Sequence, residues 1–255
     1  MLDPILQSTR SRVVALRLRT DEIEAAAAGL DAPRDFIGAL SAPGLSVIAE
    51  VKRRSPSAGS IAPDLDPAEL GSAYERGGAA AISVLTEPDH FGGSLEDLQE
   101  IGVATSIPVL RKDFILDPLQ IDEARAAGAD AVLLIAAILS DRVLGDLIDH
   151  VSRFGMAALV EAHDSEELRR AIDLGAEVVG VNNRDLASFE VDLDTSIRLR
   201  THIPSSVVAV AESGINSPQD ARRMYDAGFD AVLVGTAAAR ADDPAAFVAG
   251  LGQPA

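Results

Sequence analysis

The sequence contains no cysteine, so disulfide bonds, thiolate metal sites and a cysteine nucleophile are excluded. No apolar run approaches the roughly 20 residues that a membrane-spanning helix needs. The N-terminus carries no basic segment followed by an apolar one, as a secretory signal would. The four histidines show no metal-site spacing, and only His163 follows an expected strand. We therefore expect a cytoplasmic protein that holds no metal ion.

Positive charge is also scarce. The formal net charge of −18 at pH 7 argues against nucleic acid and against an anionic membrane as partners. An anionic substrate would therefore need a local positive site. Lys52 and Lys112 are the only lysines among the 22 basic residues. Lysine is compact and can give up its proton when desolvated, whereas arginine stays charged, so both lysines are candidates for chemistry.

A repeat organises the chain from about residue 45 onward. In four places a helix is expected to end in glycine just before a buried strand, at Gly78, Gly128, Gly175 and Gly228. The steps of 50, 47 and 53 residues suit two strand–helix units each. The alternate strands are expected at 46–52, 107–112, 156–161 and 207–212. Eight buried strands alternating with helices predict an α/β fold, a (β/α)8 TIM barrel over 45–255. An open doubly wound sheet is the alternative, but it rarely has this regular eightfold count.

Residues 1–44 are helical in character, with breaks near Gly29 and Pro33. We expect two or three short helices there, forming an N-terminal helical extension of a single domain that spans 1–255. Within the barrel, four helix starts carry a capping residue with an acid or amide three positions later. These capping residues are Asp66, Asp117, Asp164 and Ser217. We read them as structural signals without chemistry.

Charged residues gather where the strands are expected to end, which is where TIM barrels carry their reacting groups. The polar residues at these ends include Glu50, Lys52, Lys112, Glu161, Asn182, Arg184, Glu212 and Ser213. Glu50 and Lys52 are two apart and share a face of one strand, so a structural ion pair is the alternative for them. Three carboxylates facing two lysines predict acid–base chemistry, because opposite charges lower a carboxylate pKa and desolvation raises it.

Glycines follow the last two expected strands, at the position where TIM barrels usually bind phosphate. We expect a phosphate there, held by Arg54, Ser55, Gly214, Gly235 and Thr236.

Phe91 and Phe114 lie just past two strand ends and are expected to form an apolar wall for an aromatic substrate, although ordinary packing explains them equally well. Asp113 and Asp185 could orient a lysine or an arginine, or act themselves. The loop 53–64 is rich in small residues and prolines, and we expect it to close over the substrate.

Six stretches of the chain form a set. They are Glu50-Val-Lys-Arg-Arg-Ser-Pro-Ser57, Ser83-Val-Leu-Thr-Glu87 with Phe91-Gly-Gly-Ser94, Arg111-Lys-Asp-Phe-Ile115, Leu159-Val-Glu161, Asn182-Asn-Arg-Asp-Leu186 and Ala211-Glu-Ser-Gly-Ile215. Together they resemble the indole-3-glycerol-phosphate synthases. The resemblance runs from about residue 2 to 250, and other phosphate-binding barrels share only the glycines.

This resemblance implies ring closure of 1-(2-carboxyphenylamino)-1-deoxyribulose 5-phosphate to indole-3-glycerol phosphate, with loss of carbon dioxide and water, in tryptophan biosynthesis. It implies no metal or organic cofactor. By resemblance, Lys112 is the acid that helps the ring carbon attack the carbonyl. Glu161 and Lys52 serve the later dehydration with Glu50 near them, and either Glu50–Lys52 or Lys112–Glu161 is the pair that acts. Asn182 and Glu212 complete the catalytic set and position the substrate with Arg184 and Ser213.

The chain departs from the family pattern in two places. Arg54 stands where many relatives have lysine, and the run after Gly235 is smaller than in many relatives. Because the sequence ends at residue 255, we expect no fused isomerase domain, and we expect a monomer. The alternatives are an isomerase of the phosphoribosylanthranilate type, a non-catalytic phosphate-binding barrel and a flavin-binding barrel. The first would not need two lysines facing three acids.

Overall fold

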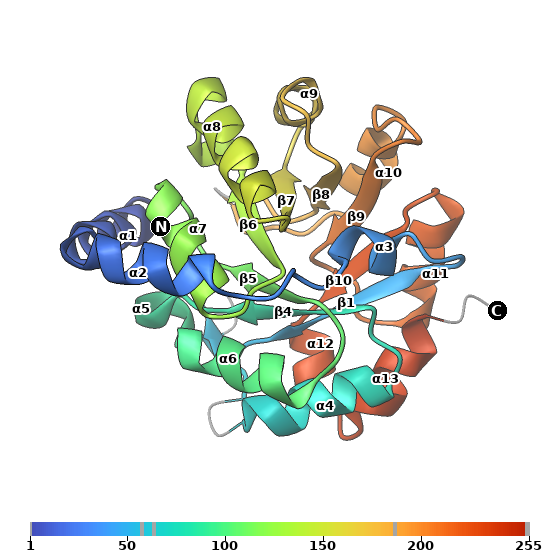
Figure 1. Cartoon of the computed structure of the whole chain (residues 1–255). Helices are drawn as coiled ribbons and strands as arrows, with labels where there is room; N and C mark the ends of the chain where they lie inside the picture. Colours follow the sequence, from blue (N-terminus) through green and yellow to red (C-terminus); the bar gives the residue numbers. More distant parts are fainter. Residues whose placement is uncertain (1, 57–58, 63–64, 186–187, 253–255) are drawn as a thin grey trace.

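A closed barrel of eight parallel strands forms the centre of the computed structural model, which describes residues 2–56, 59–62, 65–185 and 188–252 (Figure 1). The strand order around the barrel is β1-β10-β9-β8-β7-β6-β5-β4, so β1 closes the ring against β10. The barrel strands are β1 (Ser46–Val51), β4 (Ala81–Leu85), β5 (Val109–Lys112), β6 (Ala131–Ile135), β7 (Ala157–Ala162), β8 (Val178–Asn182), β9 (Val208–Glu212) and β10 (Ala231–Val234). The predicted TIM barrel is confirmed, and ring closure excludes the open sheet.

Helices surround the strands and alternate with them along the chain (Figure 1). They are α4 (Pro67–Arg76), α5 (Pro88–Phe91), α6 (Leu95–Ala104), α7 (Pro118–Ala126), η2 (Ala136–Ile138), α8 (Asp141–Arg153), α9 (Ser165–Asp173), α10 (Asp194–Arg200), α11 (Pro218–Asp226), α12 (Thr236–Ala239) and α13 (Pro244–Leu251). The four predicted caps are confirmed: each side chain accepts a hydrogen bond from a backbone N–H in the first turn of its helix.

The strands separate two apolar regions. Residues such as Val47 and Val51 face outward and pack with the surrounding helices, whereas Ile48, Leu110 and Leu159 belong to a cluster inside the barrel. This alternation follows from the two-residue period of a strand. Inward-facing positions near the C-terminal strand ends are therefore the ones that can reach a site in the barrel mouth.

The helix α3 (Phe36–Leu40) closes the opposite, N-terminal end of the barrel. Phe36 and Leu40 are fully buried within the interior cluster, beside the first residues of several strands. Burying each side chain stabilises the fold by about 1.5–3 kcal/mol. With this end filled, the barrel interior opens toward the C-terminal ends of the strands.

The N-terminal extension contains α1 (Leu2–Leu16), η1 (Arg17–Arg19), α2 (Thr20–Ala28) and α3, as predicted. Of these, α1 and α2 lie on one side of the barrel, α1 against α5 and α7 and α2 against α7 (Figure 1). Arg12 of α1 forms a two-pronged ion pair with Asp113, just past β5, with nitrogen–oxygen distances of 3.1 and 3.0 Å. The extension is thus tied to the strand end that carries Lys112.

The loop after β1 contains a small hairpin, β2 (Arg54–Ser55) paired with β3 (Gly59–Ser60). The predicted closure of 53–64 stays a prediction, and residues 57–58 and 63–64 of that loop lie outside the described residues. In the described part of the chain, no helix combines the length and the apolar character needed to cross a membrane.

Candidate active site

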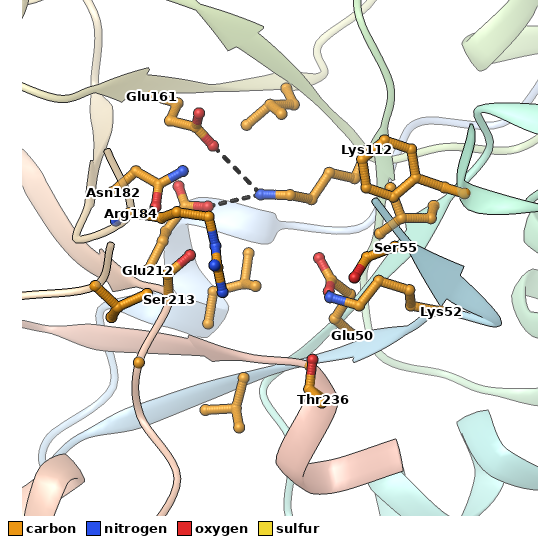
Figure 2. Close-up of a pocket in the computed structure, with 18 of the residues that line it drawn as sticks. Glu50, Lys52, Ser55, Lys112, Glu161, Asn182, Arg184, Glu212, Ser213 and Thr236 are labelled. Atoms are coloured by element: carbon orange, nitrogen blue, oxygen red, sulfur yellow. Dashed lines mark hydrogen bonds and ion pairs between the residues drawn. The ribbon is translucent and has the colours of Figure 1, made fainter. Parts of the chain in front are cut away.

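A pocket of about 680 Å³ opens at the C-terminal ends of the strands. Its polar lining brings together the six residues predicted as catalytic: Glu50, Lys52, Lys112, Glu161, Asn182 and Glu212 (Figure 2). These residues come from β1, β5, β7, β8 and β9 or directly follow them, and Asn182 and Glu212 are register partners on adjacent strands. The structure thus brings these six residues together in one pocket.

Lys112 lies between two carboxylates. Its Nζ is 2.7 Å from Glu212 Oε2 and 3.4 Å from Glu161 Oε2 (Figure 2). The Asn182 side chain also helps to lower the Glu161 pKa, and the Asn182 Oδ1 accepts from the Arg184 backbone N–H at 3.0 Å. One ammonium therefore serves two carboxylates, and Asn182 acts on one of them.

The proton distribution in this cluster follows from burial and charge. Burial raises the pKa of Glu212 and Lys112 opposes it, but the nearby charges of Glu161 and Glu50 bring that pKa to about 7. Burial also acts on Glu161, but Lys112 and His163 outweigh it and hold the Glu161 pKa below its ordinary value. Burial lowers the pKa of Lys112, and the surrounding carboxylates raise it above its ordinary value. The cluster thus combines a charged ammonium, an ionised Glu161 and a Glu212 that exchanges its proton near neutral pH.

Lys52 and Glu50 form a separate one-to-one ion pair, with Nζ 2.5 Å from Oε1. Gly235, at the end of β10, makes room for it. A Cβ at that position would lie 2.3 Å from Glu50 Oε1 and 3.0 Å from Lys52 Nζ. Gly235 was predicted to bind phosphate, and the structure gives it this steric task as well, so a substitution there would disturb the ion pair directly.

Gly180 of β8 has the same task for the other cluster, and sequence reasoning missed it. A Cβ on Gly180 would lie 2.0 Å from Glu212 Oε1. Real Cβ atoms do not approach an oxygen so closely, so a larger residue there would force the Glu212 carboxylate to shift from its place beside Lys112. A glycine inside an otherwise apolar strand was the available signal, because it marks a close approach.

The apolar side of the pocket is built from two sources. Phe91 and Phe114 both line it, with ring centroids 6.2 Å apart and a tilt of 41°. Their convergence on the pocket fits the predicted apolar wall. Leu2 and Ile5 of α1 also line the pocket, which the sequence analysis did not foresee. Their three-residue spacing places both on one helix face, and Arg12 anchors the same helix.

Most of the residues predicted to hold phosphate line the pocket. Ser55, Gly214, Gly235 and Thr236 do so, as does Ser213, which adopts a left-handed backbone with φ of 64°.

Arg54 is placed differently from the other predicted phosphate ligands. Its side chain is exposed and is not part of the pocket lining that the structure describes. The guanidinium donates instead to the backbone carbonyls of Pro88, at 3.2 Å, and of Asp89. Arg184, by contrast, does line the pocket, and its Nη1 donates to the Phe189 carbonyl at 3.1 Å.

Asp113 orients arginines rather than Lys112. Besides Arg12, it contacts the buried Arg111, whose Nη2 lies 3.2 Å from Asp113 Oδ2, and it accepts from Thr86 Oγ1 at 2.8 Å. These opposite charges outweigh burial and lower the Asp113 pKa. The two chain neighbours of Lys112, Arg111 and Asp113, are thus fixed by a buried ion-pair network.

Asp185 is the other acid that the sequence left open. Its Oδ1 accepts hydrogen bonds from Ser188, from the backbone N–H at 2.7 Å and from Oγ at 3.0 Å. Among the residues that the structure describes, no group of three or more His, Asp or Glu side chains could hold a metal ion.

Fold and site together define a TIM-barrel enzyme for acid–base chemistry. A family model described as "Indole-3-glycerol phosphate synthase" matches residues 2–251. The protein of that name from Mycobacterium avium (strain 104) is 51% identical over 253 residues, which cover 98% of this chain and 93% of the relative. The one from Parafrankia sp. (strain EAN1pec) is 55% identical over 219 residues, covering 86% and 82%. The chain belongs to the indole-3-glycerol phosphate synthase family.

Solved structures with lower identity share the fold. A thiamine phosphate pyrophosphorylase from Pyrococcus furiosus matches with a TM-score of 0.62 at 19% identity, covering 81% of this chain and 93% of that one. A 3-hexulose-6-phosphate synthase from Salmonella typhimurium matches with a TM-score of 0.65 at 18% identity, covering 82% and 97%. At such low sequence identities, these similarities support the barrel fold and nothing further.

Proposed function

We propose that the pocket closes the ring of 1-(2-carboxyphenylamino)-1-deoxyribulose 5-phosphate to give indole-3-glycerol phosphate, carbon dioxide and water. As a member of its family the chain is a decarboxylating carbon–carbon lyase of tryptophan biosynthesis. The observation that carries the proposal is Lys112 held between Glu161 and Glu212 in the pocket. This cluster offers proton donors and acceptors at one point, as the reaction requires.

Lys112 acts in the first step as general acid. The ring carbon that bears the carboxylate attacks the sugar carbonyl carbon, and the Lys112 ammonium gives its proton to the carbonyl oxygen. Carbon dioxide then leaves, and its bonding electrons restore the aromatic ring. Lysine suits this task because it presents a compact proton donor at a defined point.

The second step removes water. The new hydroxyl leaves with a proton from an acid, while a base takes a proton from the neighbouring carbon. Two pairs are within reach of the pocket, Lys112 with Glu161 and Lys52 with Glu50. Glu212 adds a carboxyl with a pKa of about 7, which can hold or release a proton at neutral pH.

The two ends of the substrate fit different walls. Phe91, Phe114, Leu2 and Ile5 offer apolar surface for the aromatic ring. The phosphate belongs at the opposite wall, where Ser213, Gly214, Gly235 and Thr236 follow β9 and β10. Arg184 also lines the pocket and supplies a cation for the ring carboxylate. We further propose a monomer in the cytoplasm, with no organic cofactor.

The test is direct turnover. The purified protein is mixed with the carboxyphenylamino-deoxyribulose phosphate, and indole fluorescence is followed together with release of carbon dioxide. We expect both signals with equal stoichiometry. Phosphoribosylanthranilate, the substrate of the rival isomerase, serves as the control and should give neither. Fluorescence absent at all substrate concentrations would contradict the proposal.

A further inference from the structure

The apolar wall of the pocket is assembled from three separate elements. Leu2 and Ile5 come from α1, Phe91 from α5 and Phe114 from the segment after β5. The helix α1 buries only four of its fifteen residues, and one of these is the polar Thr9. Because apolar burial is not directional, so few contacts leave the rotation of α1 about its own axis weakly defined. A directional contact is needed to hold Leu2 and Ile5 toward the pocket.

Arg12 supplies that contact from the same helix. Its guanidinium donates to both oxygens of the Asp113 carboxylate, and such a two-pronged pair fixes orientation as well as distance. The guanidinium also donates to Thr9 Oγ1 at 3.1 Å, and this fully buried hydroxyl donates to the Ile5 carbonyl at 3.0 Å. A continuous chain of hydrogen bonds therefore runs from Asp113 through Arg12 and Thr9 to the backbone of Ile5.

The two phenylalanines of the wall are fixed beside the same guanidinium. Asp113 Oδ1 accepts from the Phe114 backbone N–H at 2.8 Å. Arg12 Nη2 also lies 4.0 Å from Oε1 of the fully buried Glu87. Glu87 caps α5 and accepts from the Phe91 backbone N–H at 3.1 Å. Arg12 thus docks α1 onto the two carboxylates that hold the other half of the wall.

We propose that Arg12 is a positioning residue for the aromatic subsite, fixing α1 so that Ile5 and Leu2 complete the wall around the substrate ring; this rests on the proposed function. Arg12 is not among the pocket-lining residues that the structure describes, so it acts through the wall and not by touching substrate. If the wall moves, the aromatic end of the substrate loses affinity. The phosphate end, which belongs at the other wall, keeps its affinity.

The test compares Arg12→Gln with the matched control Arg17→Gln. Arg17 also ties the N-terminal extension to the barrel, with Nη2 2.8 Å from Asp117 Oδ2, but it does not line the described pocket. The chain contains no tryptophan, so binding of indole-3-glycerol phosphate can be followed by its indole fluorescence without turnover. Inhibition by inorganic phosphate reports on the other end of the pocket.

We expect Arg12→Gln to weaken product binding and to raise KM, each by about tenfold, with phosphate inhibition within about twofold of the parent. Because Arg111 and Thr86 still hold Asp113, the strand end that carries Lys112 should stay in place. The value of kcat should therefore stay within about threefold. Arg17→Gln should leave all four quantities within about twofold, since an exposed ion pair contributes little.

Two further variants separate positioning from a loss of stability. Thr9→Val keeps the side-chain shape but removes the hydroxyl between Arg12 and the Ile5 carbonyl, so it should weaken product binding by about threefold. Ile5→Ala removes the surface that Arg12 is proposed to place. In that background Arg12→Gln should weaken product binding by no more than about threefold further, because the two changes act on one contact. A thermal melt shows that each variant is folded at the assay temperature.

Three results would overturn the positioning role. They are an Arg12→Gln enzyme that binds product within twofold of the parent, an equal loss of product and phosphate affinity, and a full tenfold effect of Arg12→Gln in the Ile5→Ala background. If Arg12→Gln does not fold, Thr9→Val with unchanged product binding would overturn it as well. Failure of the proposed function would show as a parent that neither turns over the substrate nor binds the product, whereas failure of the positioning role would leave the parent active.

Discussion

The two lysines at the barrel mouth lie in different electrostatic surroundings. Lys112 is shared by Glu161 and Glu212, whereas Lys52 contacts one carboxylate, that of Glu50. In the Lys52 pair, one positive charge faces one carboxylate. One ammonium between two carboxylates leaves a surplus negative charge in a buried place, so one carboxyl tends to keep its proton near neutral pH. The Lys52–Glu50 pair therefore gives a dipole on one side of the pocket. On the other side, the Lys112 cluster gives a proton store, that is, the Glu212 carboxyl, which binds a proton near neutral pH.

Both arrangements depend on a glycine in a neighbouring strand or just beyond it. Gly180 leaves space for the Glu212 carboxylate, and Gly235 leaves space for the Glu50–Lys52 pair. The backbone of the barrel therefore decides which charges meet. The difference between the two sites lies in the number of acids, and variants that alter one lysine or one acid test it.

The largest effect is expected from Lys112→Arg. The charge stays, so the ion pairs and the fold should survive, and binding of a product analogue should change by no more than about tenfold. The guanidinium holds its proton too tightly to act as an acid, so kcat should fall at least ~10²-fold. A thermal melt and steady-state kinetics measure both. A variant that melts like the parent and keeps more than about a third of kcat would show that charge alone is needed there.

Glu212→Gln tests the proton store through stability. A carboxyl whose pKa is higher in the folded state than in the unfolded state binds its proton more tightly when folded. Its stabilising contribution is complete below about pH 4.5 and is lost as pH rises through about 7. Glutamine does not titrate, so the Glu212→Gln variant does not lose this stabilising contribution as pH rises. The unfolding free energy of the variant relative to the parent should therefore rise by about 1–3 kcal/mol between about pH 5 and pH 8.

Urea unfolding at several pH values measures this difference. Glu190→Gln is a suitable control, because Glu190 is exposed and is not among the pocket-lining residues. A pH-independent difference for Glu212→Gln would contradict a proton held by Glu212 in the folded enzyme.

A smaller effect is expected from Lys52→Arg. The one-to-one pair with Glu50 can persist with a guanidinium, but the larger group must fit beside Gly235, where space is tight. We expect kcat to fall about tenfold with an unchanged melting temperature, since arginine keeps the positive charge beside Glu50 but presents it in a bulkier group. A loss equal to that of Lys112→Arg would indicate that Lys52 is the acid of one chemical step.

Much of the site could be predicted because strand ends are readable in sequence. The repeat of glycines located the strands, and inward-facing positions at their ends gave Glu50, Lys112, Glu161 and Glu212. The contribution of Leu2 and Ile5 could not be predicted in this way, because the docking of α1 depends on the Arg12–Asp113 contact between distant parts of the chain. The contacts of exposed side chains in loops are equally hard to predict from sequence, since several partners compete for them.

Arg54 illustrates that limit and gives the smallest expected effect. From the sequence we expected Arg54 to hold the phosphate, whereas in the structure its guanidinium donates to the carbonyls of Pro88 and Asp89. Its exposure means that solvent screens its charge. We expect Arg54→Gln to leave kcat unchanged and to raise KM by no more than about threefold, because Ser213, Gly214 and Thr236 line the proposed phosphate wall without it.

Competition by inorganic phosphate provides the second measurement for this variant. If the proposed backbone donors after β9 and β10 hold the phosphate, they should bind an anion without the aromatic part of the substrate, so phosphate should inhibit the parent and Arg54→Gln to a similar degree. Thr236→Val, which removes a hydroxyl from the phosphate wall, should weaken that inhibition more. A tenfold rise in KM for Arg54→Gln, together with loss of phosphate inhibition, would show that Arg54 leaves the two carbonyls and contacts the phosphate when substrate binds.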